Sequence, residues 1–389
     1  MADRTLYYLV AATLAIGVIF SFSLTTYIGM SGGKSPAIYA LIQFGAAVGG
    51  LWLMERLSRV EPEILIHRMG FLLFGIFFVI MALMPFMPES LVPVINGAKR
   101  WIKVGPVSIS PVEFFKIGFI YFLAWSFSRK FYAMQERVAW RREMKLFIPY
   151  AAIFMIVLVL IVYMQNDLGQ GMVLGAVMVM MLLFAGASFR LFSTIAGLGF
   201  VAVIALIFVS PYRMTKVIQW WAGAQDLILS LVPGFLAERL RVEPGEINQG
   251  YQVMQSLNAI SHGGMMGQGI GNGVFKLGFV SDVHTDFVLA GIIEETGFVG
   301  ALVIALLMLA IVFRILKIAR RSSDPVFFLF SIGIGVMLVA QFAMNALGVA
   351  GMTPVKGITL PFISYGGSSI LALALAMGMI LSISRKVKL

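Results

Sequence analysis

The sequence predicts an all-α integral membrane protein, a polytopic bundle of about ten transmembrane helices, and two observations carry that prediction. Hydrophobic residues make up 60% of the 389 residues and charged residues only 12%, whereas soluble domains carry about 25% charge. The hydrophobic residues form continuous runs near the roughly 20 residues that cross a hydrocarbon core. They show no period-two alternation, so helices are expected and not a β-barrel.

Ten such runs predict the spans, near residues 5–27, 37–55, 70–86, 111–127, 147–163, 168–186, 191–210, 286–313, 327–347 and 363–383. The first run is too long for the core of a signal peptide, and no small-x-small cleavage site follows it, so it is expected to remain as a span. The whole chain, residues 1–389, is predicted to be one transmembrane domain. A large extracytoplasmic loop, residues 211–285, is expected between spans seven and eight.

The distribution of Lys and Arg predicts the orientation of the chain. Most of these 29 cations fall at the two ends of the chain and in the loops after spans two, four, six and eight. Because basic residues stay on the cytoplasmic side, both termini are expected to be cytoplasmic. The same rule accounts for the formal charge of +11 without a nucleic-acid partner. The chain has no cysteine, which excludes disulfide and thiolate chemistry.

The unusual polar residues collect on the outer face under this topology. No nucleoside triphosphate is available there, and the chain has no phosphate-binding Gly-x-x-x-x-Gly-Lys-Ser/Thr loop. A synthesis on this face needs a substrate that carries its own leaving group, and a lipid-linked pyrophosphate is such a substrate. Cations suited to that anion are Lys99, Arg100, Lys103 and Lys116.

Several of these residues have a structural alternative. Glu113 and Lys116 are three apart and share a helix face, where they could form an ion pair inside the membrane. Asp167 directly precedes an apolar run and could cap that helix, and Asp286 could cap span eight in the same way. His284 is expected to be a hydrogen-bonding neighbour and not a metal ligand, because the three histidines include no ligand-spaced pair.

Two further carboxylates follow Asp286 inside span eight. A helical wheel places Glu294 about 80° and Glu295 about 180° from Asp286, so at most one of them is expected to share its cavity. The glycine-rich segment 263–273 upstream does not have the Gly-x-Gly-x-x-Gly spacing of a nucleotide site. It is expected to form tight turns against the membrane.

Five blocks of this sequence, taken together, resemble the SEDS proteins (shape, elongation, division and sporulation) over nearly the whole chain. The blocks are residues 96–102, 111–116, 165–169, 250–295 and 360–369. Segments at 255–257, 271–273 and 354–357 are more similar to the division members than to the elongation members. Pro-Val-Glu and Gln-Asn-Asp depart from the usual Pro-Ser-Glu and Gln-Pro-Asp but keep the charged residue. Residues 217–246 are longer than usual and are expected to lie in the membrane interface.

The resemblance implies a peptidoglycan glycosyltransferase that polymerises lipid II at the outer face of the bacterial cytoplasmic membrane, with Asp286 as the catalytic carboxylate and general base. Further candidates for contacts with lipid II are Lys99, Arg100, Glu113, Lys116, Asp167, His284, Glu295, Lys356 and Ser364. A divalent cation, Mg²⁺ or Mn²⁺, held by Asp286 with a nearby carboxylate is left open.

The resemblance also implies partners, a class B penicillin-binding protein transpeptidase and other divisome proteins. Three alternatives stay open at this stage: a lipid II flippase, a non-catalytic scaffold of the division complex, and a role in elongation instead of division.

Overall fold

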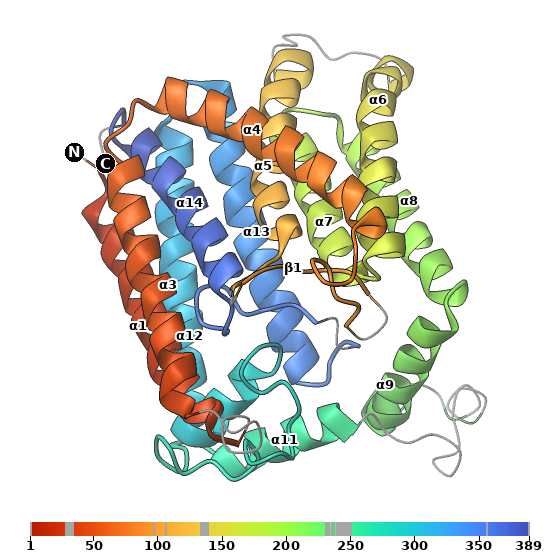
Figure 1. Ribbon diagram of the computed structural model, residues 1–389. Helices are drawn as coiled ribbons and strands as arrows, with labels where there is room; N and C mark the ends of the chain where they lie inside the picture. Colours follow the sequence, from red (N-terminus) through yellow and green to blue (C-terminus); the bar gives the residue numbers. More distant parts are fainter. Residues whose placement is uncertain are drawn as a thin grey trace.

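A computed structural model of the protein describes residues 2–27, 35–95, 98–105, 107–132, 140–229, 234, 238, 251–354 and 357–387. The described chain is a bundle of long helices, in which the two termini lie together at one end (Figure 1). One helix corresponds to each predicted span: α1 (Arg4–Leu24), α3 (Pro36–Leu57), α4 (Pro62–Leu83), α5 (Pro111–Phe127), α6 (Trp140–Leu158), α7 (Leu168–Phe184), α8 (Phe189–Phe208), α12 (Val288–Arg321), α13 (Pro325–Val349) and α14 (Gly367–Ser384).

The all-helical membrane class is confirmed. In the described part of the chain, eight helices are long and apolar enough to cross a membrane. The other two, α5 and α7, have 17 residues each, which corresponds to about 26 Å at 1.5 Å per residue and falls short of a core of about 30 Å. Among the described residues, the 3₁₀ helix η1 (Met84–Phe86) and the π-helical segments η2 (Ser128–Tyr132) and η3 (Val159–Met164) extend the ends of helices. The number of ten crossings stays a prediction.

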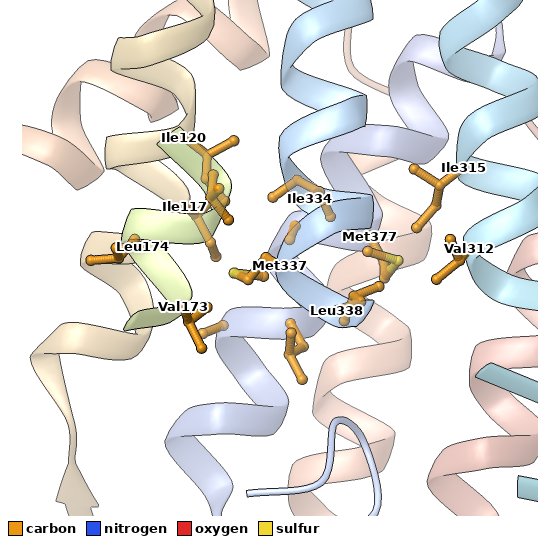
Figure 2. Packing of buried hydrophobic residues seen from close by; sticks show 14 of the residues in the cluster. Ile117, Ile120, Val173, Leu174, Val312, Ile315, Ile334, Met337, Leu338 and Met377 are labelled. Carbon is orange, nitrogen blue, oxygen red and sulfur yellow. The ribbon is translucent and has the colours of Figure 1, made fainter. Parts of the chain in front are cut away.

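The core of the bundle lies where α5, α7, α12, α13 and α14 meet. Figure 2 shows Ile117 of α5 close to Met337 of α13, with Met377 of α14 on the other side of that helix. Most of α13 and α14 is buried, whereas only about a tenth of α8 is buried. Because lipid tails are as apolar as these side chains, such exposure is expected of a helix at the rim of a membrane bundle.

A glycine allows α4 and α5 to approach closely. A Cβ on Gly118 of α5 would lie 2.2 Å from the backbone nitrogen of Phe74 in α4, so only glycine fits. Small residues at such contacts are how helices pack in a membrane, where no hydrophobic force drives them together. The contact fixes α5, which carries Glu113 and Lys116, against its neighbour.

The described chain departs from an all-helical fold at one hairpin, β1 (Ile102–Val104) paired antiparallel with β2 (Val107–Ile109). These short runs are rich in Ile and Val, which favour strands, and Gly105 turns the chain with φ of 60°. The hairpin is too short to be recognised beside the long apolar runs. It follows Lys99 and Arg100 and leads directly into α5.

In its described residues, the predicted loop 211–285 contains the helices α9 (Pro211–Leu229) and α11 (Tyr251–Gly263). Both lie at the end of the bundle opposite the termini (Figure 1). The expectation that residues 217–246 lie in the interface falls largely outside the described residues. The glycine-rich segment forms tight turns, but it packs on α12, because a Cβ on Gly267 would lie 2.3 Å from the carbonyl oxygen of Glu295.

The start and end of α12 differ from the prediction. The helix begins at Val288, two residues after Asp286, and continues to Arg321 past the predicted end at 313. Gly297 interrupts it with φ of 69°, a conformation that glycine adopts without cost. The helix is therefore kinked where the glycine-rich segment contacts it.

Candidate active site

Asp286 lies in a tight turn and does not cap α12. The cap position is taken by Phe287, and no side chain bonds to the first turn of the helix, so the capping alternative for Asp286 is wrong. The main-chain carbonyl of Asp282 accepts hydrogen bonds from the backbone N–H groups of Thr285, Asp286 and Phe287 at 3.0–3.3 Å. Asp282 itself has φ of 54°, the left-handed region in which aspartate and asparagine are enriched.

Three consecutive carbonyl groups of this turn each accept a hydrogen bond from a distant part of the chain. The donors are Tyr365 N to His284 O (2.9 Å), Ser364 Oγ to Thr285 O (2.6 Å) and Asn345 Nδ2 to Asp286 O (2.8 Å). Asn345 also donates to Ile358 O at 2.7 Å. The turn is therefore held on both sides, and the position of the Asp286 carboxylate is set by α13 and by the segment before α14.

The Asp286 side chain faces a cavity of about 220 Å³. Two acids, Asp282 and Asp286, line it together with three cations, Arg100, Arg213 and Lys216. These side chains come from three separate segments of the chain, one before α5, one within α9 and one before α12. The cavity thus combines a candidate base with groups that attract an anion.

A larger hollow, about 530 Å³, lies near the termini, but it lacks such a combination. Its arginines are already bound, since Arg4 and Arg59 both pair with Glu55 and Arg385 donates to a main-chain carbonyl. The smaller cavity around Asp286 is therefore the candidate site.

The surroundings of Asp286 favour its protonated form. Burial, followed by the negative charges of Asp282 and Asp167, raises the pKa of Asp286 to about 7, and the charge of Arg100 opposes this. A Cβ on Gly357 would lie 3.3 Å from Asp286 Oδ2, so this glycine lies directly against the carboxylate. A group that titrates near neutral pH is suited to take a proton in the reaction and release it afterwards.

Arg100 and Asp167 support the loop on which Asp167 lies. The Arg100 guanidinium donates to Gln165 O at 2.8 Å and to Asn166 O at 2.7 Å, and it lies 3.9 Å from Asp167 Oδ2. Asp167 accepts a hydrogen bond from Gln170 N at 3.1 Å, so the capping alternative for Asp167 is confirmed. Burial raises the pKa of Asp167, and the charge of Arg100 lowers it.

Glu113 and Lys116 form the ion pair that their spacing allowed. Lys116 Nζ lies 2.9 Å from Glu113 Oε2 and donates to Gln170 Oε1 at 2.9 Å, and Gln170 Nε2 donates to Glu113 Oε1 at 3.1 Å. The Lys116 side chain is only 1% exposed. These three side chains bond to one another and link α5 to α7. They do not line the cavity, so their role is to hold the two helices together.

Glu294 and Glu295 are used in structural contacts, and neither lines the cavity around Asp286. Glu295 pairs with Lys276 at 2.7 Å and accepts from Ser23 Oγ at 2.6 Å. Glu294 accepts from the backbone N–H of Val274 at 2.6 Å. These bonds tie the segment after the glycine-rich turns to α12, which explains why two carboxylates are tolerated in that helix.

The remaining candidates lie elsewhere. Lys99 Nζ donates to the carbonyls of Pro85 and Met87 at 3.1 and 2.9 Å, which closes the end of η1. The His284 ring does not have its expected hydrogen bond, since its Nδ1 is buried without a partner among the described residues, and burial lowers its pKa. Lys356 lies outside the described residues. In the described part of the chain, no three or more His, Asp or Glu gather as a metal site would require.

The sequence analysis missed four contributors. Asn345 holds the carbonyl of Asp286, Asp282 adds a second carboxylate, and Arg213 and Lys216 add two cations from α9. A signal was available for Asn345, because a polar amide inside an apolar span needs a partner. Nothing in the sequence indicates which residues of the long loop approach the cavity.

The comparisons with known proteins cover the whole chain. A family model described as cell cycle protein, FtsW/RodA/SpoVE, matches residues 3–389. A Helicobacter pylori protein named "Probable peptidoglycan glycosyltransferase FtsW" is 40% identical over 387 residues, 99% of both chains. An Escherichia coli protein of the same name is 32% identical over 400 residues, all of this chain and 87% of the relative.

Solved structures show the same fold. A chain from a study of how a peptidoglycan synthase complex coordinates polymerization and crosslinking has a TM-score of 0.70 and 25% identity, over 99% of this chain and 98% of the other. The rod shape determining protein RodA of Thermus thermophilus has a TM-score of 0.66 and 24% identity, over 100% and 98%. The resemblance to the SEDS proteins is thereby confirmed, and the chain belongs to the FtsW/RodA/SpoVE family of cell cycle proteins.

Proposed function

We propose that this protein is a peptidoglycan glycosyltransferase that polymerises lipid II, the undecaprenyl-pyrophosphate-linked disaccharide peptide, during cell division. The names of the Helicobacter and Escherichia relatives support this reaction and its place in division. The observation that carries the proposal is the Asp286 carboxylate, which faces a cavity that also holds cations, on a turn fixed by three tertiary hydrogen bonds.

In the proposed reaction the 4-hydroxyl of the acceptor sugar attacks the anomeric carbon at the end of the growing strand. A glycosidic C–O bond forms, the bond from the anomeric carbon to the phosphate oxygen breaks, and undecaprenyl pyrophosphate leaves. Ionised Asp286 takes the hydroxyl proton. Arg100, which lines the same cavity, offsets negative charge on the leaving group. Both groups are held in place before the substrates arrive, which lowers the entropic cost of reaching the transition state.

The proposed orientation places both termini in the cytoplasm and the Asp286 cavity on the outer side of the bacterial cytoplasmic membrane. It rests on the distribution of Lys and Arg and on the position of α9 and α11 at the end opposite the termini (Figure 1). Lipid II then reaches the cavity through the outer leaflet. The energy for polymer growth comes from the pyrophosphate linkage alone.

A class B penicillin-binding protein is the proposed partner, because a related chain belongs to a peptidoglycan synthase complex that both polymerises and crosslinks. Other divisome proteins would regulate the pair. The glycosyltransferase would make the strand and the transpeptidase would crosslink it.

The test is a polymerisation assay with purified protein and labelled lipid II, with and without the transpeptidase. Wild-type protein should form long glycan strands, and Asp286→Asn, which keeps the size of the side chain, should form none while retaining its thermal unfolding midpoint. Glu89→Gln is the matched control, since Glu89 is an exposed carboxylate outside the cavity, and it should behave like wild type.

Two outcomes would contradict the proposal. Strands of wild-type length from Asp286→Asn would remove Asp286 as the base. Movement of lipid II across vesicle membranes without any polymer from the wild-type protein would instead favour a flippase. An inactive variant that still localises to the division site would separate catalysis from any scaffold role.

A further inference from the structure

The cavity around Asp286 has a wall with no role in the reaction described above, the first turns of α9. Tyr212, Arg213, Lys216 and Val217 all line the cavity. Their spacing of one and four residues places them on a single face of the helix. One face of α9 is thus turned toward the site, although the helix belongs to the long loop between α8 and α12.

Two of the three cations in the cavity are already bound to main-chain carbonyls. Arg100 donates to two carbonyls of the loop before α7. Arg213 donates to Leu206 O at 3.1 Å and to Val162 O at 2.7 Å. Their guanidinium groups therefore serve in part to hold the ends of helices together.

Lys216 is different from these two arginines. Its ammonium forms no hydrogen bond or ion pair with any residue in the described part of the chain, and it lies 5.7 Å from the centroid of the Tyr212 ring. None of its three N–H donors has a hydrogen-bond acceptor among the described residues. Lys216 is half-buried, so its charge faces a partly dehydrated space in which a bound anion would be attracted strongly.

A tertiary hydrogen bond sets the position of this face. Trp220 follows Lys216 by one helical turn, and its Nε1 donates to Gly351 O at 2.7 Å. The segment after Gly351 contains Pro354 and Gly357, which line the cavity beside Asp286. The bond therefore ties α9 to the same segment that contacts the catalytic carboxylate, so Lys216 is placed relative to Asp286.

We propose that Lys216 binds a phosphate group of the lipid-linked diphosphate substrate and that the face of α9 formed by Tyr212 and Lys216 recognises that group. The inference rests on the proposed function, which brings a diphosphate into this cavity. A lysine ammonium is a compact charge that binds phosphate without a fixed geometry. Lys216 thus has donors available for direct contact with the anion, whereas Arg100 and Arg213, which already bind carbonyls, add positive charge and shape the site.

The test compares steady-state kinetics on lipid II for three variants. Lys216→Gln removes the charge and keeps most of the length, and its kcat/KM should fall roughly tenfold, as expected for a lost hydrogen bond to a charged group. Lys216→Arg keeps a cation and should restore most of the activity. In Lys216→Gln combined with Thr215→Lys, the net charge is kept but lies on the exposed side of α9, and activity should stay low.

A binding measurement separates the phosphate site from the reaction. In an Asp286→Asn background, binding of fluorescent lipid II to detergent-solubilised protein should weaken about tenfold on Lys216→Gln. Inorganic pyrophosphate should compete less well with lipid II in that variant. Binding of phosphatidylglycerol should weaken much less than binding of lipid II in Lys216→Gln, which distinguishes a site for the substrate from a site for a phospholipid headgroup.

Equal kcat/KM for wild type and Lys216→Gln would overturn the inference while leaving the proposed function in place. Full recovery on moving the charge to residue 215 would also overturn it, since a general electrostatic effect would then suffice. If the wild-type protein binds lipid II through Lys216 but forms no polymer, the phosphate site stands and the proposed reaction fails. An unchanged thermal unfolding midpoint confirms that each variant is folded.

Discussion

Replacing Asp282 by asparagine should move the pH dependence of the reaction toward acid. The negative charge of Asp282 is the second cause, after burial, of the raised pKa of Asp286. The substitution should keep the left-handed backbone at this position, because asparagine tolerates φ near 54° as aspartate does. The turn is held by the main-chain carbonyl of residue 282, which the substitution leaves in place. Only the charge is removed.

The size of the effect follows from the pKa of about 7 for Asp286. A general base must be ionised, so about one tenth of the wild-type molecules would be active at pH 6 and about nine tenths at pH 8. The wild-type kcat/KM should therefore rise about tenfold between these pH values. In Asp282→Asn the pKa of Asp286 is lower, a larger fraction is ionised at pH 6, and the rise becomes smaller.

The assay is the initial rate of lipid II polymerisation at low substrate concentration between pH 5 and 9, which reports the ionisation of the free enzyme. Asp282→Glu keeps the charge and is the matched control, so its acid limb should lie near that of the wild type. An acid limb that does not move in Asp282→Asn would refute the electrostatic argument. A wild-type profile that is flat between pH 6 and 8 would refute the assignment of Asp286 as a base of this pKa.

Two further predictions concern the position of Asp286 and the side of the membrane that it faces. Asn345→Ala removes the hydrogen bond to Asp286 O and should lower kcat about 10- to 100-fold with little change in KM. Ser331→Ala on the same helix is the control and should leave kcat unchanged, because the buried Ser331 Oγ has no partner among the described residues. Equal losses of kcat in the two variants would contradict a positioning role for Asn345. Because the chain has no cysteine, single introduced cysteines can report which side of the membrane a residue faces. In cells with a permeabilised outer envelope and an intact cytoplasmic membrane, Met266→Cys, at a position that is 79% exposed, should react with a membrane-impermeant maleimide, whereas Ser323→Cys, between α12 and α13, should not. The reverse labelling pattern would show that the topology is inverted.

The positions of the spans could be predicted because burial in lipid leaves a direct mark on the sequence. A hydrocarbon core demands a run of about 20 apolar residues, and each predicted run coincides with a helix. The short hairpin at residues 102–109 could not be found in this way, since six strand residues carry too little periodicity. The kink at Gly297 was also hidden, because a glycine in an apolar helix has many roles.

The candidate site was only partly predictable, because charge and spacing do not reveal what a side chain contacts. Lys99 and Arg100 are neighbours in the sequence, yet only Arg100 lines the cavity, while Lys99 closes the end of η1. Glu295 belongs to a predicted block, but its partner Lys276 was not recognised, and the pair is structural. Each outcome depends on which backbone carbonyls or counter-charges lie within about 3 Å in the folded chain.

The sequence by itself determined the membrane class, the positions of the spans, the family resemblance and the choice of Asp286 as the candidate catalytic residue. These depend on composition, on runs of neighbouring residues and on motifs. Only the tertiary structure decided that Asp286 is not a helix cap, that Glu294 and Glu295 lie in other contacts, and that α9 brings two cations to the cavity. The physical reason is that the site is assembled from segments far apart in the chain. Its pKa and its free donors arise from their juxtaposition, which no local pattern encodes.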